Sequence, residues 1–232
     1  MIRVFIGYDR AETVAFHVAA FSIMRRCSQP VAIVGLMLPQ LPMWRERDPR
    51  QSTDFAFSRF LVPYLCQYEG CAIFMDCDML ARADILGLWA SLPHDQAVGV
   101  VKHDYTPKTE HKFLDQPQSA YSRKNWSSVM VFNNAACRAL TPEYVNEAPG
   151  LELHQFRWLD DDAICGLDPS WNHLVGEYAP NREARLAHFT LGTPCFAKYR
   201  YCEFADEWFA EHDAMLDYDR RGEFSRPERV ET

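Results

Sequence analysis

The clearest candidates for chemistry are two carboxylates separated by one residue. The stretch CAIFMDCDML carries an apolar run, 71–75, directly into Asp76 and Asp78. Residues i and i+2 of an extended chain point to the same side, so the two carboxylates could converge on one point. Such charges repel each other and are costly to bury, and a divalent metal or an Arg or Lys side chain is the usual compensation. Solvated loop acids, or a helix N-cap, are the alternative interpretation.

His188, in LAHFTLGTPCF, is the second candidate, because it ends another apolar run before a Gly-Thr-Pro turn. A histidine in such surroundings is often a hydrogen-bonded core residue. With Asp76 and Asp78, however, it would complete a ligand set of oxygen and nitrogen atoms. Mg²⁺ prefers oxygen ligands alone, so the imidazole favours Mn²⁺, with Mg²⁺ as the alternative. Three protein ligands would leave coordination positions open for a phosphate-bearing substrate.

The elements that must position these residues alternate between strands and helices in the first half of the chain. The spacing of apolar residues predicts strands at 2–9, 31–38, 71–75 and 97–101, and helices at 12–27, 52–68 and 83–92. Pro63 is expected to kink or end the second helix. This alternation predicts an α/β fold with a mixed, mostly parallel central sheet flanked by helices, whose ligands lie at the carboxyl ends of strands. The stretches IGYD and MDCD both fall at such ends, so we expect them to face one crevice.

The second half of the chain has fewer regular patterns. Residues 102–125 are polar and lack periodicity, so we expect a loop that serves as an acceptor wall or lid, with a connection of no catalytic consequence as the alternative. Strands are expected at 127–134 and 184–189, an amphipathic helix at 203–221, and frayed residues from 222. We expect one domain, in which 1–203 form the main body and 204–232 a helix and tail that belong to it.

Composition excludes several classes of protein. The 232 residues are 48% hydrophobic and 24% charged, as in an ordinary globular protein, and the net charge of −8 argues against a nucleic-acid surface. Eight cysteines without a CxxC pair or a secretory signal favour free thiols and a cytoplasmic location. No apolar run approaches the roughly 20 residues of a membrane span. Peripheral contact with the inner face of a membrane, through the aromatic and basic C-terminal residues, is left open, as is the oligomeric state.

Seven motifs, taken in order, resemble those of one enzyme family: VFIGYD, FSRFLVPYL, IFMDCDML, SSVMVFN, LDDDAIC, PSWNHL and AHFTLG. The chain is similar over 2–196 to glycosyltransferase family 8, which includes glycogenin and bacterial lipopolysaccharide galactosyltransferases. The resemblance implies the single-domain nucleotide-diphospho-sugar transferase (GT-A) fold, with 1–203 as the glycosyltransferase domain. It also implies a hexosyltransferase that moves a sugar from a nucleotide sugar, expected to be a UDP-sugar, to a glycan, lipid-linked or small-molecule acceptor, with retention of configuration.

The resemblance also assigns roles to residues. A metal held by Asp76, Asp78 and His188 would bind the donor diphosphate and offset the charge that builds on the leaving group. The expected donor-binding residues are Gly7, Tyr8, Asp9, Arg59, Asp76, Asp78, Ser127 and Gly192. Tyr8 would stack on the base and Asp9 would bind the base or ribose, with a solvated turn as the alternative. The expected catalytic residues are Asp161, Asp160 and Arg59, although Arg59 could instead form an ordinary salt bridge.

Three departures from the family pattern leave the donor open. Trp126-Ser127-Ser128 stand where an Asn and a Gly are usual, and Asp161 replaces a Gln that faces the sugar. Thr193 replaces a Lys that touches the diphosphate, and Lys198 or Arg200 are candidate substitutes.

Parts of the pattern also occur in other classes of protein. A phosphatase of the haloacid-dehalogenase type also places D-x-D after an apolar strand, but near its N-terminus and followed by Thr or Val, whereas Met79 follows here. A nucleotidyltransferase would carry a Gly-rich phosphate loop after the first strand, which GYDRAET lacks. The departures from the family pattern keep open a degenerate sugar-nucleotide-binding protein that has lost turnover.

Overall fold

The computed structural model describes residues 1–48, 51–109, 111, 114 and 121–216. Its centre is a six-stranded sheet in the order β2-β1-β3-β6-β5-β7. The strands are β1 (Ile2–Gly7), β2 (Val31–Leu36), β3 (Cys71–Met75), β5 (Val98–Val100), β6 (Val129–Asn133) and β7 (Ile164–Gly166). β1 runs parallel to β2 and β3, and β5 parallel to β7, while β6 is antiparallel to both of its neighbours. The expected mixed, mostly parallel sheet is confirmed.

A small second sheet completes the strand framework. It has three strands in the order β4-β9-β8, which are β4 (Met79–Ala81), β9 (Leu186–His188) and β8 (His173–Leu174). β9 falls within the strand predicted at 184–189, but it pairs with β4 and β8 and does not extend the main sheet. This sheet brings two distant parts of the chain beside the end of β3.

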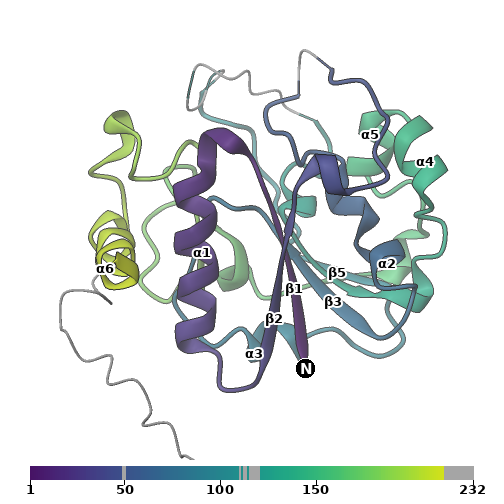
Figure 1. The fold of residues 1–232 in the computed structure, drawn as a ribbon, viewed down its shortest axis with the longest axis horizontal. Helices are drawn as coiled ribbons and strands as arrows, with labels where there is room; N and C mark the ends of the chain where they lie inside the picture. Colours follow the sequence, from purple (N-terminus) through teal and green to yellow (C-terminus); the bar gives the residue numbers. More distant parts are fainter. Residues whose placement is uncertain (49–50, 110, 112–113, 115–120, 217–232) are drawn as a thin grey trace, which may run out of the picture.

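Helices flank the sheets, with α6 lying beside α1 (Figure 1). They are α1 (Thr13–Arg26), α2 (Val62–Leu65), α3 (Leu86–Trp89), α4 (Pro142–Glu147), α5 (Gly150–His154) and α6 (Ala205–Leu216). Shorter 3-10 turns connect them at Arg10–Glu12, Leu38–Gln40, Ser58–Leu61, Trp126–Ser128, Asn134–Ala136, Asp161–Ala163, Pro169–Asn172 and Ala197–Tyr199. None of the helices in the described ranges is long and apolar enough to cross a membrane.

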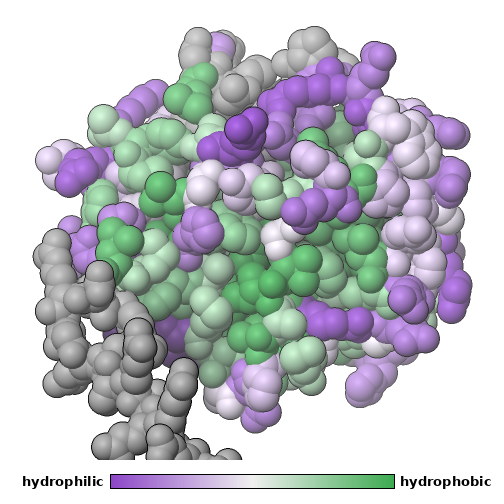
Figure 2. Space-filling view, viewed as in Figure 1, coloured by the Kyte–Doolittle hydropathy of each residue, from purple (hydrophilic) through white to green (hydrophobic). Residues whose placement is uncertain are grey.

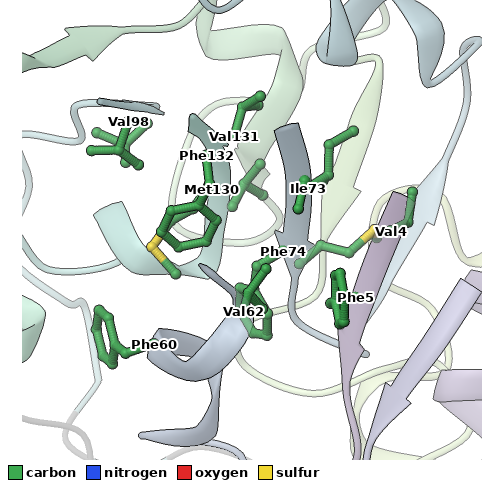
Figure 3. Packing of buried hydrophobic residues seen from close by; sticks show 14 of the residues in the cluster. Val4, Phe5, Phe60, Val62, Ile73, Phe74, Val98, Met130, Val131 and Phe132 are labelled. Atoms are coloured by element: carbon green, nitrogen blue, oxygen red, sulfur yellow. The ribbon is translucent and has the colours of Figure 1, made fainter. Parts of the chain in front are cut away.

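The main core lies on both sides of the central strands (Figure 3). Ile73 and Phe74 of β3 follow each other in the chain and are both fully buried, as are Val131 and Phe132 of β6. Neighbouring strand residues point to opposite faces, so both faces of the sheet are covered. This explains why these strands read as continuous apolar runs in the sequence.

A smaller core joins α6 to the rest of the molecule. Trp208 of α6 is 1% exposed and packs in a cluster with Val18 of α1, Leu80 of β4 and Phe189. The described part of the expected C-terminal helix therefore packs on the main body. Residues 217–232 lie outside the described residues, and the boundary at 203 stays a prediction.

The exposed face near β2 carries apolar surface. β2 is an edge strand with β1 as its neighbour, and Figure 2 shows hydrophobic atoms over this side of the molecule. Val34 of β2 and Val14 and Met24 of α1 are 40, 44 and 55% exposed.

The helix predicted over 52–68 is wrong for most of its length. A 3-10 turn covers Ser58–Leu61, and a single α-helical turn follows at Val62–Leu65. Two causes are visible. Asp54 N donates to the Asp9 carboxylate, 2.9 Å away, which ties the segment to the turn after β1. Pro63 lies in the first turn of α2, where its missing N–H costs nothing, so it begins the helix instead of ending it.

Candidate metal and donor site

Two backbone connections fix the D-x-D segment after β3. Asp76 N donates to Ser128 O at 3.0 Å, which ties the segment to the start of β6. The β4–β9 pairing places Met79 opposite His188, and Phe189 N donates to Asp78 O at 2.8 Å. The ladder between β4 and β9 therefore sets His188 beside the carboxylates, although more than a hundred residues of chain separate them.

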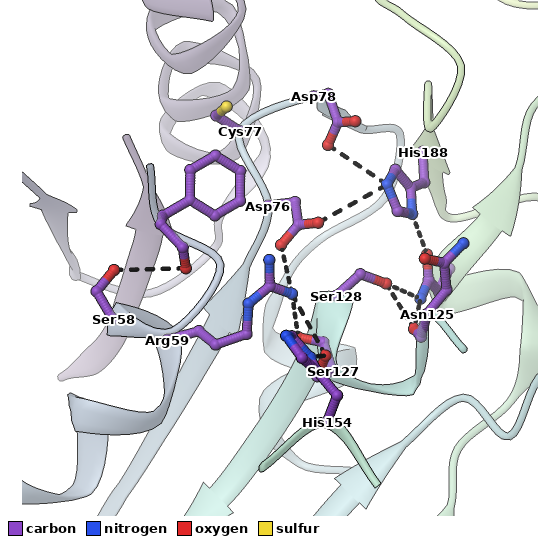
Figure 4. Close-up of polar contacts among 12 residues, drawn as sticks. Ser58, Arg59, Asp76, Cys77, Asp78, Asn125, Ser127, Ser128, His154 and His188 are labelled. Carbon is purple, nitrogen blue, oxygen red and sulfur yellow. Dashed lines mark hydrogen bonds and ion pairs between the residues drawn. The ribbon is translucent and has the colours of Figure 1, made fainter. Parts of the chain in front are cut away.

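The structure brings together the three predicted metal ligands (Figure 4). His188 Nε2 lies 3.4 Å from Asp78 Oδ1 and 4.0 Å from Asp76 Oδ2. One ligand atom from each residue lies within 4.8 Å of the others. His188 and Asp78 are buried, whereas Asp76 is partly exposed and lines a cavity. Cys77 between them is fully buried, and its burial raises the pKa of its thiol well above the usual value, so the thiol stays protonated.

Asn172 fixes which nitrogen of His188 faces the carboxylates. Asn172 Nδ2 donates to Ser128 Oγ at 2.8 Å, so its Oδ1, 2.9 Å from His188 Nδ1, accepts a hydrogen bond from that nitrogen. In the neutral imidazole, Nε2 then presents a lone pair to two carboxylates. This arrangement is unfavourable without a cation and is the usual one for a histidine that binds a metal. The donor set therefore fits a divalent ion. The Asn of PSWNHL was the sequence signal for this role, which the sequence analysis missed.

Arg59 supplies a positive charge beside the two carboxylates, which the sequence suggested as the alternative to a metal. Its Nη1 forms an ion pair with Asp76 Oδ1 at 3.0 Å and donates to Ser127 O at 2.8 Å. The guanidinium is buried, and its carbon lies 4.9 Å from the centre of the Phe74 ring. Arg59 thus holds one oxygen of Asp76 and leaves the other directed at His188. It does not line the cavity in the described part of the chain, so its contact with a donor stays a prediction.

The carboxylates and His188 open into a cavity of about 560 Å³. Among the described residues, its walls come from 45–57, 121–125 and 149–154, together with Thr190. Tyr121, Lys124 and Asn125 belong to the segment 102–125, which was expected to form an acceptor wall. Residues 110, 112–113 and 115–120 of that segment lie outside the described residues.

The residues after β1 do not line this cavity. A Cβ on Gly7 would lie 2.3 Å from the Phe55 ring, so that ring covers the end of the strand. The Asp9 carboxylate accepts from Ala11 N at 2.8 Å and from Asp54 N at 2.9 Å. The Tyr8 hydroxyl lies 3.0 Å from Thr13 Oγ1. These side chains stabilise the turn into α1, and their predicted contacts with a nucleoside stay predictions.

Asp160 and Asp161 also lie away from the described cavity lining. Both are exposed, and both oxygens of Asp161 accept from Arg123 Nη2 at 2.7 Å. This hydrogen bond and the positive charge of Arg123 hold the pKa of Asp161 below its usual value. The structure therefore does not bring these two residues together with the metal ligands, and their catalytic role stays a prediction.

The C-terminal candidates for donor contact have partners of their own. Thr193 is fully buried with its Oγ1 3.0 Å from Cys195 Sγ, and Gly192 N donates to Phe189 O at 2.8 Å. Lys198 lies over the Tyr199 ring and Arg200 over the Phe209 ring, at 5.4 and 4.7 Å from the ring centres. The cations that line the cavity in the described residues are instead Arg45 and Lys124.

His154 is a cavity residue that the sequence analysis missed. It ends α5, and its Nδ1 lies 2.9 Å from Ser127 Oγ. Burial, and next the positive charges of Arg59, Lys124 and Arg45, lower the pKa of His154 well below its usual value, so the imidazole is neutral. No motif marks this position, because its role depends on the contact between His154 at the end of α5 and Ser127 in the 3-10 turn before β6.

Comparison with solved structures shows the fold. The chain superposes with a TM-score of 0.64 on the apo structure of the bifunctional glycosyltransferase WbbM, at 14% identity over 91% of this chain and 49% of that one. The glycosyltransferase GlyE of Streptococcus pneumoniae gives a TM-score of 0.60, 12% identity and coverage of 93% and 62%. The galactosyltransferase LgtC, solved with donor and acceptor sugar analogues, gives a TM-score of 0.56 at 12% identity. The match covers 92% of this chain and 96% of that one. The fold is thus that of the GT-A nucleotide-diphospho-sugar transferases.

Comparison of sequences identifies a relative. No protein-family model matches the chain. The curated Protein CDI of Arabidopsis thaliana is 41% identical over 229 residues, which cover 94% of this chain and 87% of the relative. Because that identity extends over nearly the whole of both chains, this chain belongs to the family of Protein CDI.

Proposed function

We propose that this protein is a metal-dependent glycosyltransferase that moves a sugar from a nucleotide-sugar donor to an acceptor. One observation carries the proposal: Asp76, Asp78 and His188 converge at the carboxyl end of β3, beside a cavity of about 560 Å³, in a GT-A fold. In open α/β sheets this end of the strands is where ligands bind. The resemblance to family 8 supports retention of configuration, a UDP-sugar donor and hexosyl transfer.

The residues of the site have separate tasks in this proposal. Asp76, Asp78 and His188 would hold Mn²⁺ or Mg²⁺, and a bound divalent ion supplies Lewis-acid stabilisation of a leaving diphosphate. Asn172 keeps the His188 lone pair directed at the site, and Arg59 orients Asp76. Lys124 and Arg45 line the cavity and would attract an anionic donor. The leaving phosphate would take the acceptor proton, so no protein base is assigned.

Calorimetry with a panel of nucleoside diphosphates, with and without Mn²⁺, tests the donor and the metal together. We expect UDP to bind only with Mn²⁺, and Asp78→Asn to abolish that binding because it removes one ligand charge. Asp206→Asn makes the same chemical change on the exposed first turn of α6 and should bind as the unchanged protein does. Binding that is independent of metal, or is unchanged in Asp78→Asn, would contradict the metal site.

Turnover separates the enzyme from a second candidate, a sugar-nucleotide-binding protein without activity. The placement of Asp161 in an exposed pair with Arg123 favours this second candidate, because no described carboxylate from 160–162 lines the cavity. Release of UDP from a UDP-sugar in the presence of acceptor extracts supports the transferase. Binding without any such release supports the second candidate, and release of phosphate from phosphomonoesters would indicate a phosphatase. With this activity we propose that the acceptor is a glycan, a lipid-linked molecule or a small molecule. We also propose a cytoplasmic location.

A further inference from the structure

The His154 ring forms a fixed part of the cavity wall. Its centre lies 5.6 Å from the Phe57 ring, 5.3 Å from the Phe60 ring and 6.1 Å from the Tyr121 ring. These contacts come from different segments of the chain, so they hold the plane of the imidazole from several sides. Its two nitrogens therefore point in set directions.

The hydroxyl of Ser127 determines which nitrogen of His154 carries the proton. Ser127 is 3% exposed, and Arg59 Nη1 donates to its carbonyl at 2.8 Å and reaches its Oγ at 3.5 Å. A buried hydroxyl must also donate its own hydrogen. Among the described residues, its acceptor is His154 Nδ1, 2.9 Å away. Ser127 Oγ therefore donates and His154 Nδ1 accepts. Figure 4 shows these two residues side by side.

The remaining nitrogen of His154 is then a neutral donor. Because burial and three nearby cations lower the pKa of His154 well below its usual value, the ring carries a single proton, and that proton lies on Nε2. Within the described part of the chain, Nε2 of His154 has no hydrogen-bond partner. It is also not one of the fully buried polar atoms that lack a partner, so it is accessible. It thus reaches the cavity that the ring lines. A neutral imidazole N–H binds a ligand oxygen without adding charge.

A chain of contacts fixes this donor relative to the metal ligands. Asp76 Oδ1 pairs with Arg59 at 3.0 Å, Arg59 holds Ser127, and Ser127 holds His154. In the proposed function, a metal at the carboxylate cluster holds the diphosphate, so the sugar attached to it would lie next to the cluster. Its hydroxyl oxygens are the acceptors that an N–H donor requires.

We propose that His154, and not Ser127, contacts the transferred sugar, and that its Nε2–H donates to a sugar hydroxyl oxygen. The inference rests on the proposed function, because it assumes a nucleotide-sugar donor. Ser127, predicted from the sequence to bind the donor, becomes a positioning residue that sets the tautomer of His154.

The first test compares UDP with UDP-glucose and UDP-galactose by calorimetry in the presence of Mn²⁺. His154→Phe keeps an aromatic ring and removes the donor. We expect the affinity for UDP to be unchanged and the affinity for at least one UDP-sugar to fall about tenfold, as for one lost hydrogen bond. His154→Gln, which carries an amide donor, should restore part of that loss. His94→Phe, at an exposed position, is the matched control.

The second test begins with the protein alone. Long-range ¹H–¹⁵N spectra of the histidine rings report the tautomer directly, and we expect His154 to carry its proton on Nε2. In Ser127→Ala we expect a mixture of tautomers and a weaker UDP-sugar affinity at unchanged UDP affinity. A proton on Nδ1 in the unchanged protein, or an unaltered ratio of UDP-sugar to UDP affinity in His154→Phe, would overturn the inference alone. Absence of any nucleotide binding by the unchanged protein would contradict the proposed function and the sugar contact together.

Discussion

Asn172 Oδ1 lies 2.9 Å from His188 Nδ1, and this contact decides what His188 can do. Asn172 is fully buried, and its amide nitrogen is held by Ser128 Oγ at 2.8 Å. The amide therefore has one orientation, in which its oxygen accepts a hydrogen bond from Nδ1 and leaves Nε2 directed at Asp76 and Asp78. The contact thus orients a candidate metal ligand as well as packing the core.

Removal of this contact should weaken metal binding before it changes the fold. We expect Asn172→Ala to lower the affinity for Mn²⁺ by roughly 10- to 100-fold, the usual effect of losing a partner behind a metal ligand. Asn172→Asp keeps an acceptor oxygen and should lose less. Mn²⁺ titration followed by electron paramagnetic resonance measures both, with Asn181→Ala as a control outside the cavity. Equal Mn²⁺ affinity in Asn172→Ala and the unchanged protein would contradict the role given to Asn172.

The three candidate metal ligands could be located from sequence because they lie at strand ends. Apolar runs show where β3 and β9 end, and Asp76 and His188 stand at these ends. The two strands belong to different sheets, and the pairing of β4 with β9 brings their ends together. The sequence also predicted that a metal ion or a basic side chain would balance the negative charge of the two carboxylates. The structure uses Arg59 for one oxygen of Asp76 and leaves room for a metal at the other.

The remainder of the site depends on packing that no local pattern records. His154 reaches the cavity because three aromatic rings position it, and Asp161 misses it because Arg123 binds both of its oxygens. Gly7 was predicted to face a ligand, but the Phe55 ring lies over it. The motifs showed where these stretches lie in the sequence. They did not show where the side chains point, because contacts between distant segments determine that.

The contact between Gly7 and Phe55 predicts a large cost for one added methyl group. A Cβ on Gly7 would lie 2.3 Å from the Phe55 ring, which is itself buried, so Gly7→Ala should destabilise the protein by about 1–3 kcal/mol. Urea denaturation measures the difference. Gly166→Ala is the matched control, since its Cβ would meet only the Lys102 side chain at 3.7 Å and should change stability little. A smaller side chain at Phe55 should recover part of the loss, and a Gly7→Ala protein of unchanged stability would refute this packing.

Glu211 anchors α6 to α1. Glu211 is 3% exposed, and its Oε1 lies 2.7 Å from Arg26 Nη2 and 3.1 Å from Arg25 Nη1. Glu211→Gln removes the charge and weakens both contacts, so we expect a loss of about 1–3 kcal/mol in unfolding free energy. Glu183→Gln, at an exposed position, should have almost no effect. A loss in Glu183→Gln as large as that in Glu211→Gln would show that the effect is not specific to this anchor.

His103 should make the protein sensitive to acid. Burial, and next electrostatic interactions with His188 and His173, lower the pKa of His103 to about 3, while the unfolded chain keeps a value near 6.5. Between these values the unfolded state binds the extra proton, so His103 favours unfolding as the pH falls and has no such effect above about 6.5.

The expected slope for this single residue reaches about 1.4 kcal/mol per pH unit. Denaturant titrations between pH 7 and pH 4 should therefore show a shallower loss of stability in His103→Gln than in the unchanged protein, even if the loss of the His103 contact with the Tyr178 hydroxyl, at 2.9 Å, lowers its stability at pH 7. His94→Gln, at an exposed position, should keep the full slope. Parallel pH curves for His103→Gln and His94→Gln would show that another group causes the acid sensitivity.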